Sequence, residues 1–435
     1  MFMKRTSILT LSLVLGLSAA QAQSKHSPTS RYPTYEGRVM CGYQGWFRAP
    51  DDGANEGWGH YGVRGRLDST HVHLDVWPEV SEYEKTYPTA LTNQDGAAAR
   101  VFSSWDESTT DLHFRWMQQY GIDGVFMQRF FGVTRSEPSR RKSRLILEHA
   151  LTAAQKHGRA IAVMYDLSGL RSSGEDCASI ILDWRELVDE LKLTSQGTNQ
   201  TYLYHRGKPL VAIWGLGFPD RSYNLRTIGI EKLIEFFKHD PVYGGCSVLL
   251  GVPTYFRALE VDCLPDPYLH EVIASADLVM PWTVQRFTPL LHVDAARYAA
   301  QVKADLAWCR ERRVDYAPCV CPGFSWYNLG KVEFGGLPPL NQIPRQKGAF
   351  YWSQIAGAIQ SGAKMVYVAM FDEMDEGTAI FKCSNHPPVG PQLCDYEGLP
   401  SDHYLWLTGQ AGRMLRGEIT FSSKLPVRTE SNPRQ

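Results

Sequence analysis

The sequence lacks several features that would assign it to a common functional class. Acidic and basic residues nearly cancel, with 46 Asp and Glu against 45 Lys and Arg, so no excess positive charge favours a nucleic acid or another polyanion. No Cys-x-x-Cys pair has zinc-site spacing, and no internal repeat or low-complexity tract is present. No apolar run is long enough for a membrane span. These absences argue against nucleic-acid-binding, zinc-ribbon and membrane-spanning proteins.

The N-terminal residues have the pattern of a secretory signal peptide. Lys4 and Arg5 supply positive charge, residues 8–17 form a short apolar run, and Ala20-Gln21-Ala22 offers a small-residue cleavage site. We therefore predict a signal peptide over residues 1–22 and an exported chain that is periplasmic or extracellular.

The nine cysteines leave at least one without a disulfide partner. Most lie inside apolar runs, where they are expected to act as small core residues. Cys383 and Cys394 flank the proline-rich residues 385–393 and are the best-placed pair for a disulfide in an exported protein. The sequence alone leaves open whether that bond forms.

Apolar, strand-like runs recur along the chain, and each is followed by a helical pattern. They are rich in Val, Ile, Met and aromatic residues without clean alternation, which is typical of parallel strands covered on both faces. The predicted strands are residues 38–47, 121–130, 160–167, 209–215, 247–255, 276–284, 315–322 and 364–371.

About eight strand–helix units in a chain of this length predict an α/β fold with a single (β/α)8 TIM barrel. This catalytic domain covers residues 23–423 and is followed by a tail, residues 424–435. An open doubly wound sheet is the alternative, but no glycine-rich phosphate loop follows the first strand. Residues 48–100 form a long insertion after that strand, and we expect them to cover the barrel mouth.

The strongest functional signal follows the last predicted strand. The apolar run 364–371 ends in four acids within five positions, Asp372, Glu373, Asp375 and Glu376. Gathering carboxylates at a buried strand is costly because they lose hydration and repel one another. Barrel enzymes place their active sites at such strand ends. Glu373 and Glu376 match the pair of a glycosidase, one protonated acid and one ionised base or nucleophile. A structural ion-pair network is the alternative.

Other strand ends carry aromatic and polar side chains that suit a sugar, although each alone would also fit core or loop packing. The predicted substrate-binding residues are Gln44, Trp46, His71, His73, Asp166, Trp214, Tyr255, Trp282, Trp326 and Asp372.

The segment His71-Val72-His73-Leu74-Asp75 is the main competing signal. In an extended segment these two histidines and Asp75 face one way and could bind a divalent metal. Together with Asp372 they would fit a metal-dependent, amidohydrolase-like barrel enzyme. The pair lies well after the first strand, however, and no histidine lies at the exit of the fifth or sixth strand. We therefore predict no metal and no other cofactor. A catalytically silent carbohydrate-binding barrel is the second alternative.

The acidic stretch also resembles a known signature. Residues 372–378 read Asp-Glu-Met-Asp-Glu-Gly-Thr and resemble the Asn-Glu-Trp-His-Glu-Gly-Thr of glycoside hydrolase family 99, the endo-α-mannosidase family. Weaker similarities extend the resemblance over most of the mature chain, and it points above all to bacterial family 71/99-like proteins, some labelled xylosidase/arabinosidase. These similarities lie at residues 40–47, 121–124, 253–256 and 404–408.

This resemblance implies a metal-free (β/α)8 barrel that cleaves an oligo- or polysaccharide with retention of configuration. It implies that Glu373 is the base assisting attack by the sugar's own 2-hydroxyl, and that Glu376 is the general acid. Met374 and Asp375 stand where the family has Trp and His, and Asp372 where it has Asn. These extra acids could reassign the roles, and neither mannose specificity nor endo action is implied.

Overall fold

The computed structural model describes residues 23–171, 174–197, 200–289, 294–333, 335–336 and 338–428. The predicted signal peptide and residues 429–435 of the predicted tail lie outside the described residues. Among the described helices, none combines the length and the apolar character that crossing a lipid bilayer would require.

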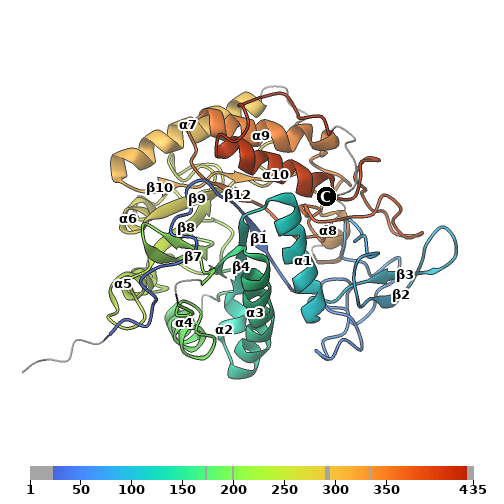
Figure 1. Cartoon of the computed structure of the whole chain (residues 1–435), viewed down its shortest axis with the longest axis horizontal. Coiled ribbons are helices and arrows are strands. Elements are labelled where there is room, and N and C mark those ends of the chain that lie inside the picture. Colours follow the sequence, from blue (N-terminus) through green and yellow to red (C-terminus); the bar gives the residue numbers. More distant parts are fainter. Residues whose placement is uncertain are drawn as a thin grey trace, which may run out of the picture.

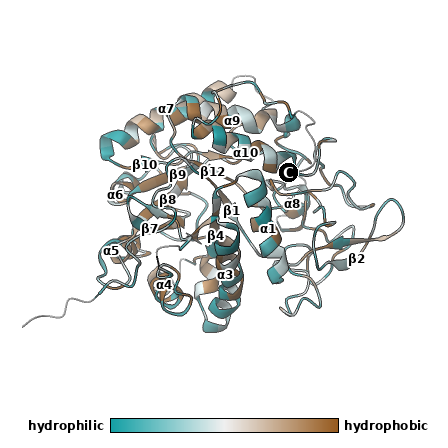
Figure 2. Cartoon of the chain, viewed as in Figure 1, coloured by the Kyte–Doolittle hydropathy of each residue, from teal (hydrophilic) through white to brown (hydrophobic). Residues whose placement is uncertain are grey.

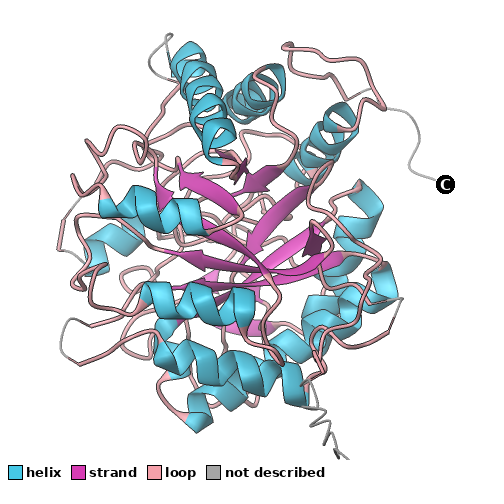
Figure 3. Ribbon diagram, turned by 90° about the vertical axis from the view of Figure 1, so that its left-hand side faces the viewer, coloured by secondary structure: helices cyan, strands magenta, loops and turns pink. Residues whose placement is uncertain are grey.

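A ten-stranded sheet forms the centre of the molecule, and helices surround it (Figure 3). Neighbouring strands follow the order β10-β9-β8-β7-β5-β4-β1-β12-β11 in parallel pairs, and β6 pairs antiparallel with β7. The strands of this sheet are β1 (Val39–Tyr43), β4 (Gly124–Phe130), β5 (Ala160–Asp166), β6 (Tyr204–His205), β7 (Lys208–Trp214), β8 (Ser247–Pro253), β9 (Leu278–Trp282), β10 (Asp315–Tyr316), β11 (Cys319–Val320) and β12 (Val366–Val368). A separate hairpin consists of β2 (Tyr87–Thr92) and β3 (Ala98–Val101).

The sheet curls so that β1, its first strand in the sequence, pairs with β12, its last. Val39 of β1 lies opposite Val366 of β12, which is the pairing that the barrel prediction requires. The two edge strands, β10 and β11, are separated by only two residues of one segment, 315–320. Within that segment, Pro318 O accepts a hydrogen bond from Tyr367 N (2.9 Å). The fold is therefore an α/β fold with a curled parallel sheet. Its two edge strands, β10 and β11, come from one short segment of the chain.

The helices cover the outside of the sheet (Figures 1 and 3). They are α1 (Glu107–Tyr120), α2 (Phe131–Thr134), α3 (Glu137–His157), α4 (Ala178–Glu190), α5 (Ile230–His239), α6 (Tyr268–Ser275), α7 (Asp294–Arg312), α8 (Tyr327–Glu333), α9 (Ala349–Gln360) and α10 (His403–Leu415), with a 3-10 turn at Gln346–Gly348. Figure 2 shows hydrophilic colour on parts of α3 and α7 and hydrophobic colour on β8 and β9. This distribution is the one that strands buried under amphipathic helices produce.

The longest helix, α3, shows how the sequence sets its boundaries. The side chain of Ser136 accepts a hydrogen bond from the Ser139 N–H, and a proline occupies the first turn. The helix ends at Gly158, whose φ of 58° is the left-handed conformation that favours glycine. This helix packs beside β4 and contributes one wall of a cavity described below.

The long insertion, residues 48–100, reaches the carboxyl-terminal ends of the strands. The Asp75 N–H donates to the carbonyl of Met374 (3.0 Å). His60 Nδ1 lies 3.2 Å from Asp375 Oδ2. The insertion therefore contacts the acidic stretch directly, on the face where we expected it.

The nine cysteines all lie within the described residues and are free, so the candidate pair Cys383 and Cys394, which the sequence left open, is not joined in the structure. One short segment of the insertion pairs with both cysteines, Val76 with Cys394 and Pro78 with Cys383. Burial raises the pKa of the Cys383 thiol to about 12, so this thiol is protonated at neutral pH.

Candidate active site

A cavity of about 450 Å³ lies where the parallel strands end, and both predicted catalytic glutamates line it. This volume is within the usual range of small-molecule sites. We refer to it as the acidic cavity. The predicted residues that line it are Gln44, Trp46, Asp166, Trp214, Trp282, Trp326, Glu373 and Glu376. They lie at or beyond the carboxyl ends of six different strands, so the fold brings together side chains that are far apart in the sequence.

The two glutamates differ in their hydrogen bonds. Glu373 is 5 % exposed, and its carboxyl accepts hydrogen bonds from Gln44 Nε2 (2.9 Å) and Thr378 Oγ1 (3.0 Å). Among the described residues, none donates a hydrogen bond to the Glu376 carboxyl, which is more exposed to the cavity. Hydrogen bonds to a carboxylate favour its ionised form. The contacts therefore favour a negative charge on Glu373.

Burial dominates the electrostatics of this pair. It raises the pKa of Glu373 well above the usual range, and the charges of Glu376 and Asp375 act in the same direction. Burial, followed by the charges of Asp375 and Asp166, raises the pKa of Glu376 to about 8. Each charge raises the pKa of its neighbour, so the two carboxyls avoid being ionised together. The hydrogen bonds from Gln44 and Thr378 favour the ionised form of Glu373 over that of Glu376.

The turn that presents the two acids is held by its own backbone, by a buried arginine and by close packing against a neighbouring segment. The Thr378 N–H donates to the carbonyl of Glu373 (3.1 Å). The buried guanidinium of Arg345 donates to the carbonyl of Gly377 (2.8 Å). Gly377 has a φ of 60°, and a side chain there would approach the backbone of Ser325 to 3.1 Å. These contacts hold both carboxyl groups toward the cavity, and neither carboxyl group takes part in them.

The third acid of the stretch, Asp375, has a histidine partner from the insertion. Its Oδ2 lies 3.2 Å from His60 Nδ1, and its Oδ1 is buried and has no hydrogen-bond partner among the described residues. The His60 ring stacks on Trp46 with 3.8 Å between centroids and 4° between planes. Sequence reasoning missed His60, because it lies in an irregular segment whose contacts depend on how the insertion folds back.

Asp372 does not line the acidic cavity, contrary to our expectation. Its side chain is fully buried and accepts hydrogen bonds from the N–H groups of Gln44 (2.8 Å) and Gly45 (2.9 Å). Burial raises its pKa to about 7, and these two hydrogen bonds partly oppose that rise. Asp372 therefore joins the turn after β1 to the last strand and positions Gln44, which in turn binds Glu373.

The predicted histidines also lie outside the lining of the acidic cavity. His71 Nδ1 is 2.8 Å from Asp68, and His73 Nε2 is 3.1 Å from Glu333. Within the described part of the chain, no three His, Cys, Asp or Glu side chains are grouped as metal ligands. His71, His73 and Asp372 each have a different protein partner, so the ligand set of the metal-dependent alternative is not assembled.

Tyr255 is placed beyond the cavity lining as well, where its hydroxyl accepts a hydrogen bond from Arg297 (3.3 Å). The cavity is also lined by residues that we had not singled out, among them Gln128, Phe130, Phe218 and Arg221. Arg221 lies 5.2 Å from the ring of Trp214 and adds a cation to the wall. Gln128 and Phe130 lie two positions apart at the end of β4, so their side chains face the same way. That spacing was the only sequence signal for them.

Comparisons with known proteins agree with this description at the level of the fold. No family model matches the chain, and no curated protein matches its sequence. Among solved structures, the fold is shared with glycoside hydrolases of family 99, which agrees with the family resemblance at the level of the fold.

Two of these structures are of one enzyme, the GH99 endo-α-mannosidase from Bacteroides thetaiotaomicron. Its complex with bis-tris propane is similar with a TM-score of 0.62 and 17 % identity, covering 88 % of this chain and 99 % of that one. A second structure of this mannosidase gives a TM-score of 0.60 and 16 % identity over the same shares.

Proposed function

We propose that this chain is a glycoside hydrolase in which Glu373 and Glu376 are the catalytic pair. The observation that carries the proposal is the acidic cavity itself, where two buried carboxyls in different hydrogen-bonding environments face a wall of four tryptophans. Cleavage of a glycosidic bond needs one protonated and one ionised carboxyl beside the sugar. Aromatic faces suit the C–H faces of sugar rings. The fold shared with GH99 endo-α-mannosidase structures supports the same class.

The roles of the two acids follow from their surroundings. Glu376 gives its proton to the glycosidic oxygen as that bond breaks. Glu373, held by Gln44 and Thr378, takes the proton of the sugar's 2-hydroxyl, whose oxygen attacks the anomeric carbon. Glu376 then deprotonates a water that opens the anhydro-sugar, and Glu373 returns its proton to the 2-oxygen. Two displacements at the anomeric carbon retain its configuration. This route, with attack by the 2-hydroxyl, rests on the resemblance to family 99.

We further propose that residues 315–320 act as one strand that closes the sheet into a (β/α)8 barrel. The segment pairs with β9 through its first residues and with β12 through its last. A closed barrel accounts for the acidic cavity being lined from so many strand ends. We also propose export, which the composition of residues 1–22 supports. Mass spectrometry of protein recovered outside the cytoplasm, with a new N-terminus near Gln23, tests this.

A substrate screen tests the proposed activity. The wild-type protein is incubated with a panel of aryl glycosides and polysaccharides, and released sugar and binding are both measured. Hydrolysis of one class that stops in the Glu373→Gln/Glu376→Gln double variant supports the proposal. Glu235→Gln, at a solvent-exposed position (73 % exposed), is the matched control and should behave as wild type. Tight binding of an oligosaccharide without turnover would instead identify a catalytically silent carbohydrate-binding barrel.

A further inference from the structure

Two cationic side chains, Arg221 and Arg286, line the acidic cavity. Both belong to loops that follow strands, Arg221 after β7 and Arg286 after β9. The Arg286 guanidinium donates a hydrogen bond to Asp262 (2.6 Å), whose side chain is buried. The charge of Arg286 is therefore neutralised within the protein.

Arg221 has no comparable partner. Among the described residues, its only ion-pair partner is Asp220, at 3.8 Å, and the Asp220 side chain is 71 % exposed. An ion pair this long and this exposed contributes little. The Arg221 side chain is 23 % exposed and lines the cavity, so a ligand in the cavity can contact it.

Asp166 also lines the cavity but does not pair with Arg221. No ion pair joins the two side chains in the described part of the chain, and the Asp166 carboxyl accepts a hydrogen bond from the Ser168 N–H (2.6 Å). Burial raises the pKa of Asp166 to about 6, and the charge of Arg221 is the weakest of the influences that oppose this rise. A guanidinium in contact with the carboxyl would hold that pKa below its usual range. Asp166 therefore does not neutralise Arg221.

Two aromatic rings hold Arg221 in the cavity wall. Its guanidinium carbon lies 5.2 Å from the ring centre of Trp214 and 5.2 Å from that of Phe218. The two rings pack on each other with 5.0 Å between centroids. Such contacts attract the cation and restrict its orientation. A guanidinium held in this way loses little freedom when it binds a carboxylate or a similar group.

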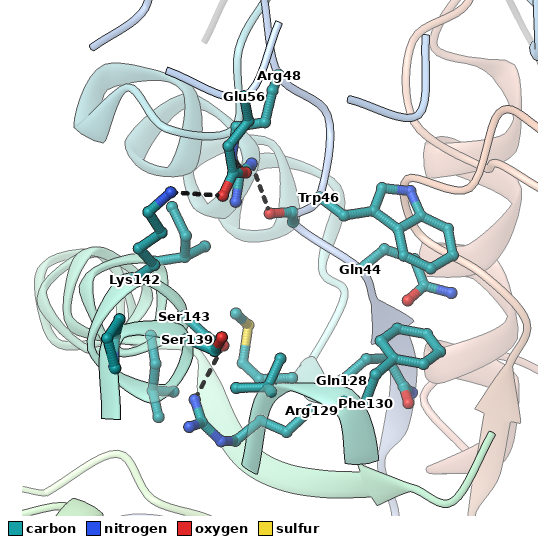
Figure 4. A pocket seen from close by; sticks show the side chains of 17 residues that line it. Gln44, Trp46, Arg48, Glu56, Gln128, Arg129, Phe130, Ser139, Lys142 and Ser143 are labelled. Atoms are coloured by element: carbon teal, nitrogen blue, oxygen red, sulfur yellow. Dashed lines mark hydrogen bonds and ion pairs between the residues drawn. The ribbon is translucent and has the colours of Figure 1, made fainter. Parts of the chain in front are cut away.

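The cations of a neighbouring cavity show a different arrangement. This cavity of about 420 Å³ lies between the insertion, β4 and the first turns of α3 (Figure 4). Lys142 Nζ lies 3.0 Å from one carboxylate oxygen of Glu56, and Arg48 Nε lies 3.4 Å from the other. These two cations share one carboxylate, and each is closer to it than Arg221 is to its own exposed partner.

Arg221 lies on a different wall of the acidic cavity from the catalytic glutamates. The strand that precedes it, β7, is separated from β12 along the sheet by β5, β4 and β1. A sugar with its anomeric carbon at Glu373 and Glu376 would therefore present to Arg221 a group that is remote from the cleaved bond. The separation also limits repulsion between a negative group at Arg221 and an ionised Glu373.

We propose that Arg221 binds a carboxylate or sulfate group of the substrate, so that the preferred substrate is a glycan with an anionic sugar in the acidic cavity. This inference rests on the proposed glycosidase function and makes its substrate class more specific. Arginine donates parallel hydrogen bonds to the oxygens of such groups. The preference is a local property of the cavity, because the chain as a whole carries no excess positive charge.

Matched pairs of oligosaccharides test this proposal. Oligogalacturonides and glucuronoxylan oligosaccharides supply carboxylates, and carrageenan oligosaccharides supply sulfate esters. Each is compared with its carboxyl-reduced or desulfated form, which keeps the linkages and loses the charge. We expect kcat/KM to favour the charged form of the cleaved glycan by about tenfold or more, equivalent to about 1.4 kcal/mol. The pair that shows this preference identifies the anionic group.

Substitutions at Arg221 test whether this side chain causes the preference. Arg221→Gln should remove it, and Arg221→Lys, which keeps the charge but loses the planar guanidinium, should keep part of it. Arg226→Gln is the matched control, because Arg226 belongs to the same loop, does not line the cavity and pairs with Asp266 (2.7 Å). The control should keep the full preference. Thermal unfolding checks that each variant is folded.

Two results would overturn the inference and leave the glycosidase function standing. The wild type would cleave the neutral form of each pair at least as well as the charged form, or a folded Arg221→Gln variant would keep the full preference. The wild-type comparison needs no variant, so it decides the matter even if Arg221→Gln does not fold.

Calorimetric binding separates this inference from the proposed function. If the wild type cleaves no glycan but binds a charged oligosaccharide more tightly than its neutral form, and Arg221→Gln loses that difference, the hydrolase function fails and the anionic ligand class stands. Neither cleavage nor binding of any glycan would refute both.

Discussion

Replacing Glu376 by Gln gives the sharpest prediction of the account. The substitution removes the carboxyl proton, whereas the nearby hydrogen bonds to Glu373 are unaffected. General acid catalysis typically contributes about 10²–10⁴-fold, so kcat/KM on a natural glycan should fall by that factor, or about 3–5 kcal/mol of transition-state stabilisation. The fold should be intact, because no described residue relies on the Glu376 carboxyl as a hydrogen-bond acceptor.

The assay compares two leaving groups on the same sugar. With an activated aryl glycoside the departing oxygen needs no proton, so Glu376→Gln should recover most of its lost rate. Glu373→Gln should not recover, because attack on the anomeric carbon still needs a base. Circular dichroism and thermal unfolding check that both variants are folded. Equal loss on both leaving groups in Glu376→Gln, or near-normal rates in both variants, would refute this division of roles.

Three further predictions follow from the same contacts. Because the raised pKa keeps Glu376 protonated at neutral pH, kcat should decline as pH rises past about 8, and a kcat–pH profile of Glu376→Gln should lack that decline. Gln44→Ala should lower kcat more than it changes KM, since it removes a hydrogen bond to Glu373 (2.9 Å). A change confined to KM would contradict a role for Gln44 in holding Glu373. Arg129→Met should cost about 3–5 kcal/mol in urea denaturation, because Asp183 is left as an unpaired buried charge; a loss below about 1 kcal/mol would contradict it.

The strands were predictable where both faces are buried. Residues 160–167 were predicted as a strand and form β5 almost unchanged, because an apolar run between helices has few other stable arrangements. The run 364–371 is a regular strand only over Val366–Val368, because the chain then turns to present its acids. The run 315–322 is split at Pro318, which has no N–H to donate to a neighbouring strand.

The candidate site was predictable where a residue lies at or shortly after the carboxyl end of a predicted strand. Glu373, Glu376 and the four tryptophans were found this way, since parallel strands end on one face. Asp372 was given the wrong position, because sequence does not show that its carboxyl would bind two backbone N–H groups. His60 was missed, because its contact with Asp375 depends on the tertiary path of the insertion.

The central claim is that Glu373 and Glu376 together hydrolyse a glycosidic bond with retention. Time-resolved proton NMR of the wild-type protein with a cleaved oligosaccharide tests it most directly, because it shows both bond cleavage and the anomer released first. The account predicts a first product with the same anomeric configuration as the substrate, and no product from the Glu373→Gln/Glu376→Gln double variant. Release of the inverted anomer, or an undiminished rate in the double variant, would contradict it.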